Sequence, residues 1–369
     1  MLKTDKKKIC IVAISLSKGG AERSVSMLTH MLSRIGHEVH LVILVNQIYY
    51  SYSGNLFNLG ISKDINGDTI FSRLKRFKKF RDYLKVQEFD FIIDHRPKNN
   101  YYRELFYQKY LYRDIKKIYV LHSSKQVLNT KDSLHRFIKI YKSNYVNIAV
   151  SNYIKNEILK ANGLDNSLTI YNAYDPKWID SDKISENPLN DKNYILSYGR
   201  IEDEIKDFRF LIDSFFKSKL WEKNIFLVIL GDGKDKEELK VYVEQLKCSD
   251  FILFYPYTTN PFPYIYNSKF VTLTSRYEGF PMVILESLSV GVPIISLDIK
   301  SGPNEIIIHK ENGLLVPNRN VDDFAKAMIS LFQDEKLYNH CKNRASNSVE
   351  KFSINNISRH WEQLIKHAQ

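Results

Sequence analysis

Short apolar runs alternate with segments of helical period along both halves of the chain. In the first half the helical pattern of residues 21–35 stops at Gly36, a residue typical of helix ends. Strands are predicted in this half at 8–15, 38–45, 89–94, 117–121 and 146–150. Regular alternation of strands and helices predicts α/β domains built on doubly wound parallel sheets.

The alternation stops in a polar segment, residues 174–192, which contains two prolines and is interpreted as a linker. Strands are then predicted at 194–198, 225–230, 251–254, 270–274 and 293–297. Helices are predicted at 207–217, 234–246, 282–289, 321–333 and 355–367. A chain of 369 residues is long for one core and fits two domains, which we place at 1–175 and 176–353.

Composition indicates a soluble globular protein, with 44% hydrophobic and 26% charged residues. No apolar run reaches the roughly 18–20 residues that cross a membrane. The three cysteines lie far apart, a pattern that favours neither a disulfide framework nor a zinc site.

Charge is distributed unevenly between the two halves. Residues 1–180 carry 30 lysines and arginines against 16 acidic residues, whereas residues 181–369 carry 24 against 26. Within the first half, seven basic residues crowd the segment 71–86, where Leu74, Phe77, Phe80 and Leu84 recur at helical spacing. Such a helix suits an anionic membrane surface. The alternative is a solvated helix packed on its own domain.

Two carboxylates, Glu278 and Glu286, flank a turn and an apolar helical run. The preceding segment, residues 269–275, is predicted to be a buried strand, and Pro281 suits the first turn of a helix. Glu278 is therefore expected in the loop after a strand, and Glu286 in the following helix. Open α/β sheets bind ligands at this edge, where the pair could hold hydroxyl groups of one elongated ligand.

Glycines and cations follow two other predicted strands. The turn around Gly20 opens the first helix, where backbone N–H groups can approach an anion. It lacks the spacing of a dinucleotide-binding loop. Arg200 and Lys206 follow the strand at 194–198, and two cations there could stabilise a departing diphosphate without a metal.

These segments together resemble the retaining glycosyltransferases of family 4 (group 1), of the type that builds bacterial surface polysaccharides. The resemblance rests on the motif from Glu278 to Glu286, the Gly-Gly-Ala-Glu-Arg turn at 19–23, the Gly-Arg loop at 199–200 and the Gly-Asp-Gly turn at 231–233. It implies a GT-B fold, in which two Rossmann-like domains face each other across a cleft. It also implies that the final helix, 354–369, packs back onto the first domain.

The implied activity is transfer of a hexose or N-acetylhexosamine, with retention, from a nucleotide sugar. A UDP-sugar is the expected donor, and the expected acceptor is a growing lipid-linked glycan of capsule or lipopolysaccharide biosynthesis. Such an enzyme works in the cytoplasm, peripherally at the inner face of the cell membrane. The segment 71–86 would provide the contact with that surface.

The resemblance also implies roles for individual residues. Glu286 would bind the ribose, Glu278 would lie near the sugar, and His122 would contact the sugar or phosphate, with His95 as a second choice. Asn172 matches an asparagine near the hinge. The catalytic residues would be Glu278, His122, Arg200 and Lys206; the donor-binding residues would be Gly20, Arg200, Lys206, Gly279, Phe280, Met282 and Glu286.

Neither a metal nor a cofactor is expected. Asp180 and Asp182 form an Asp-x-Asp pair, but it lies in the polar linker rather than at a strand end. Two alternative enzymes on this fold are a sugar-nucleotide epimerase and a phosphorylase, the latter marked by a lysine-bound pyridoxal phosphate. The basic first half also admits a nucleic-acid-binding protein, whose affinity would fall steeply with salt. A nucleic-acid-binding function would not explain the carboxyl-terminal motifs, so no nucleic-acid partner is expected.

Overall fold

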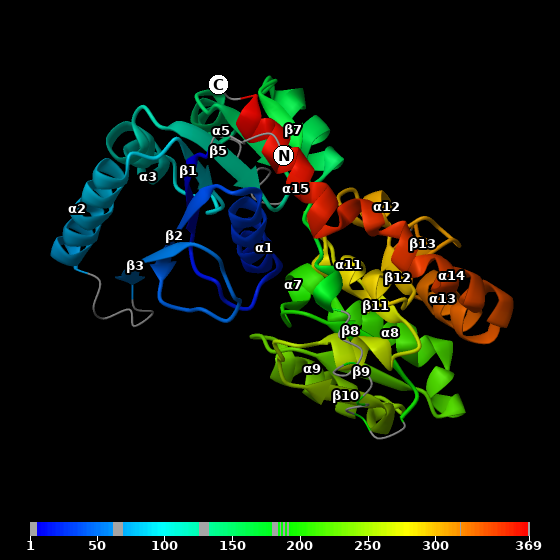
Figure 1. Cartoon of the computed structure of the whole chain (residues 1–369). Helices are drawn as coiled ribbons and strands as arrows, with labels where there is room; N and C mark the ends of the chain where they lie inside the picture. Colours follow the sequence, from blue (N-terminus) through cyan, green and yellow to red (C-terminus); the bar gives the residue numbers. More distant parts are fainter. Residues whose placement is uncertain are drawn as a thin grey trace. The chain divides into compact units, whose positions relative to one another are not determined.

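The computed structural model describes residues 6–61, 69–124, 133–178, 192–317 and 319–367, together with Ile184, Glu186 and Leu189. The chain forms two compact units (Figure 1). The first comprises residues 1–173 and 354–369, and the second comprises residues 174–353. Asp180 and Asp182 lie outside the described residues, so the expectation for this pair stays a prediction.

The first unit is built on a parallel sheet with the strand order β3-β2-β1-β4-β5-β6-β7. Ile9 of β1 pairs with Val39 of β2 on one side and with Phe91 of β4 on the other. The strands are β1 (Lys8–Ala13), β2 (Glu38–Val45), β3 (Asn55–Ile61), β4 (Phe91–Asp94), β5 (Lys116–Leu121), β6 (Val146–Ala149) and β7 (Ser167–Thr169). The five strands predicted in this half are confirmed within two residues at each end.

Two edge strands of this sheet were not predicted. In β3 the asparagines Asn55 and Asn58 interrupt the apolar pattern, because an edge strand keeps much of its surface in water. At the opposite edge, β7 has only three residues, too few for a pattern to emerge. Neither strand therefore shows the continuous apolar run that a long strand buried on both faces shows.

Helices cover the sheet of the first unit. Gly36 ends α1 with φ of 105°, and its N–H donates to the carbonyls of Leu32 and Ser33, as predicted for a helix stop. The last helix, α15, packs on α1 and buries Trp361. The helices and turns are α1 (Gly20–Ile35), α2 (Ile70–Gln87), α3 (Tyr101–Phe106), η2 (Tyr107–Tyr112), α5 (Ser133–Lys142), η3 (Ile154–Leu159), η4 (Lys160–Asn162) and α15 (Ile354–Lys366).

The second unit has its own parallel sheet, with the order β10-β9-β8-β11-β12-β13. The chain therefore adds strands outward from β8 in one direction and outward from β11 in the other. The strands are β8 (Tyr194–Tyr198), β9 (Phe226–Leu230), β10 (Ile252–Tyr255), β11 (Val271–Leu273), β12 (Ile294–Leu297) and β13 (Gly313–Val316). The five predicted strands are confirmed, whereas β13, a four-residue edge strand, was not predicted.

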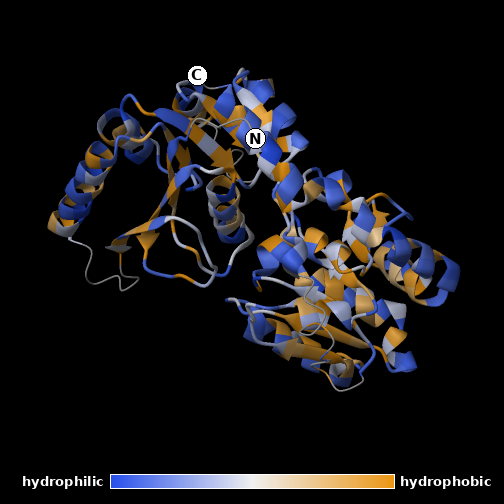
Figure 2. Cartoon of the chain, in the orientation of Figure 1, coloured by the Kyte–Doolittle hydropathy of each residue, from blue (hydrophilic) through white to orange (hydrophobic). Residues whose placement is uncertain are grey.

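Helices flank this second sheet and close its core around Phe215, Phe270 and Phe324. Hydrophobic residues concentrate in strands such as β9 and β10, while α14 is largely hydrophilic (Figure 2). The helices and turns are η5 (Pro176–Trp178), α7 (Asp203–Lys206), α8 (Phe208–Ser218), η6 (Leu220–Lys223), α9 (Lys236–Glu244), η7 (Ser249–Phe251), α10 (Phe262–Tyr266), α11 (Met282–Ser289), α12 (Pro303–Ile306), α13 (Val321–Gln333), α14 (Glu335–Ser348) and η8 (Glu350–Phe352).

Candidate functional site

The second unit brings two of the predicted site residues together at the carboxyl ends of β8 and β11. These strands are neighbours, and the chain leaves them in opposite directions along the sheet. A doubly wound sheet opens a crevice at such a switch point, and ligands bind there. Lys206 follows β8 and Glu278 follows β11, so both predicted residues lie at this edge.

Lys206 and Glu278 form an ion pair across the switch point. The Lys206 Nζ lies 2.6 Å from the Glu278 Oε1, and the two side chains are 21% and 13% exposed. A hydrogen bond between charged groups of this length is strong because each side chain is largely shielded from water. A cation and an anion are thereby held side by side within reach of a ligand at this edge.

Glu286 lies in the second turn of α11 and is only 4% exposed. Its Oε2 accepts a hydrogen bond of 2.7 Å from the Tyr198 hydroxyl. Sequence reasoning missed Tyr198, although it is the last residue of β8, directly before the Gly-Arg loop. Because a carboxylate oxygen has two lone pairs, this bond leaves Glu286 able to accept hydroxyl groups as well.

The loop between β11 and α11 carries Gly279, Phe280 and Met282. The Phe280 ring packs edge-on against Phe352 at 5.1 Å, and the Met282 side chain is buried, so only their backbone N–H groups suit ligand binding. Pro281 is the residue before the first helical position of α11, rather than a member of its first turn as predicted. With φ of −72° and ψ of 115° it is extended, the conformation of an N-cap.

The turn at Ser301 and Gly302 supports this loop and was not predicted from the sequence. The Ser301 hydroxyl donates to the Gly279 carbonyl at 2.9 Å. Gly302 has φ of +101°, and a Cβ there would lie 2.5 Å from Pro281 Cδ. Only glycine fits this approach, and the Ser-Gly-Pro run at 301–303 is the sequence signal that could have indicated a tight turn.

Arg200 lies apart from the Lys206–Glu278 pair in its contacts. Its side chain is 60% exposed, and its Nη1 lies 3.4 Å from the Glu202 Oε1. The Gly-Asp-Gly turn packs under the same loop, since a Cβ on Gly231 would lie 2.0 Å from the Gly199 carbonyl oxygen. The glycine is therefore required by close backbone packing at this position.

The turn that opens α1 belongs to the first unit. Gly20 is the first residue of α1, and Gly19 is its N-cap. The tightest position is Gly19, because a Cβ there would lie 2.1 Å from the Glu22 Oε2. Farther along α1, the Ser24 hydroxyl donates to the Asn172 Oδ1 at 2.8 Å, which ties this helix to the segment after β7.

His95 and His122 follow the neighbouring strands β4 and β5, and their rings meet. His95 Nδ1 lies 2.9 Å from His122 Nε2, so one hydrogen joins two rings. Burial lowers the pKa of His122 to about 4, assisted by the positive charge of Lys98. Burial, with the nearby His122, holds the pKa of His95 well below its usual range. Both rings are therefore neutral at pH 7.

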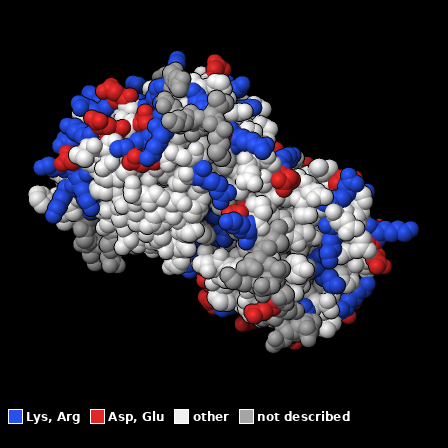
Figure 3. Space-filling view, viewed as in Figure 1, with Lys and Arg blue, Asp and Glu red and all other residues white. Residues whose placement is uncertain are grey.

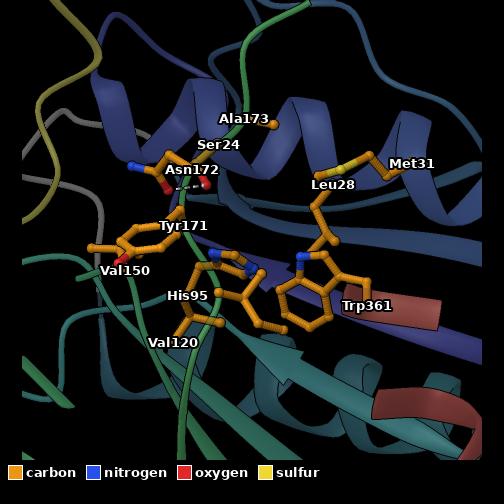
Figure 4. Close-up of a pocket in the computed structure, with 11 residues that line it drawn as sticks. Ser24, Leu28, Met31, His95, Val120, Val150, Tyr171, Asn172, Ala173 and Trp361 are labelled. Carbon is orange, nitrogen blue, oxygen red and sulfur yellow. Dashed lines mark hydrogen bonds between the residues drawn. The ribbon is translucent and has the colours of Figure 1, made fainter. Parts of the chain in front are cut away.

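His95 also borders a small cavity of the first unit (Figure 4). Its Nε2 is buried and has no hydrogen-bond partner among the described residues. Ser24, Asn172 and Trp361 line the same cavity, so the predicted His95 and Asn172 are brought close to one another. A water in the cavity could satisfy the ring nitrogen.

A buried ionic network stands beside this histidine pair, and sequence reasoning missed it. Arg96 lies 2.6 Å from Asp94 and 3.1 Å from Glu104, while Lys98 lies 2.9 Å from Asp94. Burial alone would raise the pKa of Asp94, but Arg96 and Lys98 outweigh that effect and hold it well below its usual range. Burial lowers the pKa of Lys98 to about 8, against the opposing pull of Asp94.

The basic segment 71–86 lies within α2, as predicted, but its apolar residues divide into two groups. Phe80 and Leu84 are buried against the unit, and the Phe77 ring packs against Phe106 in a tilted arrangement, with ring centroids 4.3 Å apart. Leu74 is instead exposed, together with Ile70, Phe71 and Val86. Lys and Arg side chains gather over the part of the first unit that carries α2 (Figure 3). We call Ile70, Phe71, Leu74, Lys75, Lys78 and Lys85 the α2 surface.

Within the described residues, no cluster of three or more His, Cys, Asp or Glu side chains could hold a metal ion. None of the helices in the described ranges is long and apolar enough to cross a membrane.

Comparison with solved structures defines the fold class. The chain is similar to HepE from Anabaena in complex with UDP and glucose, with a TM-score of 0.79 and 17% identity, covering 98% of this chain and 100% of that one. It is also similar to the lipopolysaccharide outer core galactosyltransferase WaaB in its apo form, with a TM-score of 0.69 and 21% identity, covering 98% and 100%. The predicted GT-B fold, with two Rossmann-like domains, is confirmed.

Sequence comparison then defines the family. The family described as "Glycosyltransferase Family 4" matches residues 18–178, and the one described as "Glycosyl transferases group 1" matches residues 179–348. The chain therefore belongs to the family 4, group 1 glycosyltransferases. The resemblance drawn from the sequence motifs is confirmed, and the chain is a glycosyltransferase.

Two relatives show the range of activities in the family. The chain is 26% identical, over 95% of its length and 97% of the relative, to the N-acetylgalactosamine-N,N'-diacetylbacillosaminyl-diphospho-undecaprenol 4-alpha-N-acetylgalactosaminyltransferase of Campylobacter jejuni. It is 31% identical to the lipopolysaccharide 1,6-galactosyltransferase of Salmonella typhimurium. That match spans about half of each chain, 52% of this one and 54% of the relative.

Proposed function

We propose that this glycosyltransferase moves a hexose or N-acetylhexosamine from a UDP-sugar to a growing lipid-linked glycan, with retention of configuration and without a metal or cofactor. The product would be a bacterial surface polysaccharide such as capsule or lipopolysaccharide. The observation that carries the proposal is the Lys206–Glu278 pair at the switch point of the second unit, 2.6 Å apart.

The pair suits a donor whose diphosphate leaves as the sugar develops positive charge. Lys206 would stabilise the negative charge on the diphosphate, and the exposed cation of Arg200 would assist it. Glu278 would then support the positive charge on the sugar ring. Because Lys206 is paired with Glu278 before donor binds, the arriving diphosphate would compete for the cation and leave the carboxylate facing the sugar.

Remaining groups of the second unit would fix the donor's position. Glu286, oriented by Tyr198, would accept the ribose hydroxyls. The backbone N–H groups of Gly279, Phe280 and Met282 would donate hydrogen bonds to the hydroxyls of the sugar. With the acceptor attacking from the face that the diphosphate leaves, the configuration would be retained.

Two predicted residues of the first unit would also contact the donor. Gly20, at the start of α1, would approach the diphosphate through its N–H. His122 would contact the sugar or phosphate as a neutral ring, since its pKa of about 4 keeps it uncharged at pH 7. A neutral ring can accept a hydrogen bond from a hydroxyl group, whereas an imidazolium cannot.

The lipid-linked acceptor is supported by the Campylobacter relative, whose name specifies a diphospho-undecaprenol substrate. The enzyme would meet such an acceptor at the inner face of the cell membrane. The α2 surface supports this location, because exposed Ile70, Phe71 and Leu74 stand next to exposed lysines. Exposed apolar residues beside basic ones suit binding to an anionic bilayer surface, because the apolar side chains can enter the bilayer while the lysines contact its anionic headgroups.

A panel of nucleotide sugars tests the donor assignment. The full chain should unfold at a higher temperature with one UDP-sugar than with the same sugar on GDP or on TDP, because only the bound donor stabilises the fold. Stabilisation by GDP-sugars alone would contradict the UDP assignment. Cofactor absorbance near that of pyridoxal phosphate in the purified protein would favour the phosphorylase alternative instead.

A further inference from the structure

We propose that Asp207, Arg319 and Thr274 form a clamp of positioning residues that holds Lys206 against Glu278. The role in catalysis rests on the proposed function, whereas the clamp itself is a property of the second unit. Its members come from three separate places: the residue after α7, the segment after β13 and the residue after β11.

Asp207 directly follows Lys206 and adopts a conformation that is unusual for its type. Its φ is +54° and its ψ is 52°, in the left-handed region that glycine normally fills. Such a conformation is unfavourable for a residue with a side chain and persists only where its surroundings hold it. The carboxylate is also buried, with 5% exposure, so it needs partners.

Two arginines supply those partners. The Asp207 Oδ2 accepts a hydrogen bond from Arg319 Nη1 at 2.5 Å and forms an ion pair with Arg276 Nη2 at 2.8 Å. Arg319 reaches further, because its Nη1 also donates to the Thr274 carbonyl at 2.9 Å and its Nη2 to the Ser275 carbonyl at 2.8 Å. One guanidinium therefore joins the turn after Lys206 to the strand end that leads into Glu278.

A second set of bonds runs between the same two segments. The Thr274 hydroxyl lies 3.0 Å from the Lys206 carbonyl and 3.1 Å from the Asp207 carbonyl, so its single hydrogen is shared between them. The Arg276 N–H donates to the Ile205 carbonyl at 2.8 Å. The backbone on either side of Lys206 is thus fastened to the backbone that precedes Glu278, which fixes the distance that their ion pair must bridge.

The clamp depends on the planar fork of arginine. Arg319 meets one carboxylate and two carbonyls with two nitrogens, and a lysine has a single point donor that cannot span them. Arg319→Lys keeps the positive charge and removes this geometry. Arg209→Lys is a matched control, because Arg209 pairs with Glu238 at 2.7 Å and with Asp203 at 3.7 Å, and makes no contact with Asp207, Arg319 or Thr274 among the bonds described.

The first measurement needs no ligand. The full chain is labelled with trace acetic anhydride, and the acetylation rate of Lys206 is read by mass spectrometry against the exposed Lys217 in the same molecule. In the wild type, pairing with Glu278 slows Lys206. Arg319→Lys should raise the relative rate several-fold, and Arg209→Lys should not. An unchanged rate in Arg319→Lys would overturn the clamp, as would an equal rise in both variants.

A second pair of variants tests the clamp independently, in case Arg319→Lys does not fold. Thr274→Val has nearly the same shape as threonine but lacks the hydroxyl, whereas Thr274→Ser keeps it. The clamp predicts faster labelling of Lys206 in Thr274→Val and a rate near that of the wild type in Thr274→Ser. Equal rates in these two variants would contradict the role of the hydroxyl bonds.

The functional consequence is measured by calorimetric titration with UDP. Arg319→Lys should weaken UDP binding by about tenfold, the loss of one hydrogen bond to a charged group. In a Lys206→Ala background it should change the affinity by less than about twofold, because the residue it positions is gone. Equal losses in both backgrounds would show that Arg319 does not act through Lys206. If the wild type binds no UDP, the proposal of a UDP-sugar donor is wrong. The acetylation rates of Lys206 still test whether the clamp holds this side chain.

Discussion

The histidine pair of the first unit predicts an acid-sensitive fold that can be measured without knowing any substrate. Burial lowers the pKa of His122 from 6.5 to about 4. Between these values the unfolded chain binds a proton at this site that the folded chain rejects. Stability is therefore fully present above pH 6.5 and is lost as the pH falls toward 4.

The expected magnitude follows from the same two values. A difference of 2.5 between the unfolded and folded pKa corresponds to about 3 kcal/mol in the fully protonated limit, of which about 2.5 kcal/mol is lost between pH 7.5 and 4.5. His95 contributes in the same direction, because burial and His122 lower its pKa as well. Replacing His122 with Asn should therefore remove at least this part of the pH dependence.

Trp361 reports on the first unit selectively. It is one of three tryptophans, it is buried in α15, and it lines the same cavity as His95. In a Trp178→Phe, Trp221→Phe background, urea unfolding followed by Trp361 fluorescence gives the unfolding free energy at each pH. His135→Asn, which removes an exposed histidine of α5 in the same unit, is the matched control.

The difference between wild type and His122→Asn is the decisive quantity, since the other titratable groups are common to both proteins. The gap in unfolding free energy should change by about 2.5 kcal/mol from pH 7.5 to 4.5, and His135→Asn should follow the wild type. Parallel curves for wild type and His122→Asn would refute the neutral, buried histidine pair.

Three further predictions concern the donor, the metal and the membrane. Glu286→Gln should weaken UDP binding by about 1–3 kcal/mol, because it removes a charged acceptor; wild-type affinity by calorimetry would remove Glu286 from the donor site. Turnover should survive excess EDTA. Loss of turnover in EDTA with recovery in Mn²⁺ would contradict metal independence and indicate Asp180 and Asp182 as metal ligands. Replacing Lys75, Lys78 and Lys85 with Ser should weaken the free energy of binding to anionic vesicles by about 3 kcal/mol, at about 1 kcal/mol per lysine. Co-sedimentation measures this binding, and the difference between the variant and the wild type should shrink in high salt. Lys223, Lys247 and Lys300, exposed on the second unit, provide the control with the same charge change; equal release by both triple variants would mean that the α2 surface has no special role.

Buried, regular elements were predictable because their patterns are local. The strand Glu38–Val45 and the helices Met282–Ser289 and Val321–Gln333 match their predicted bounds. Burial on both faces makes a strand uniformly apolar, and Asn320 caps the last of these helices through its side chain. The edge strands β3, β7 and β13 lack such signals, since they are short or keep one side in water.

The site was predictable only as separate pieces. Lys206 and Glu278 were each placed after a strand, but their contact joins residues 72 positions apart and depends on β8 lying next to β11. The clamp residue Asp207 gave no signal, because a left-handed turn is expected at glycine rather than at aspartate. Likewise, no local pattern around Asp94, Arg96 and Lys98 indicates the buried network that they form.

The central claim is retaining transfer from a UDP-sugar at the Lys206–Glu278 site. The most direct test follows the anomeric proton of a stabilising UDP-α-sugar by NMR during incubation with the full chain and a glycan acceptor. The account predicts that the donor signal disappears and that the first product carries the α configuration, with turnover greatly reduced in Glu278→Gln. A first product of β configuration, or consumption of donor at the wild-type rate by Glu278→Gln, would contradict it.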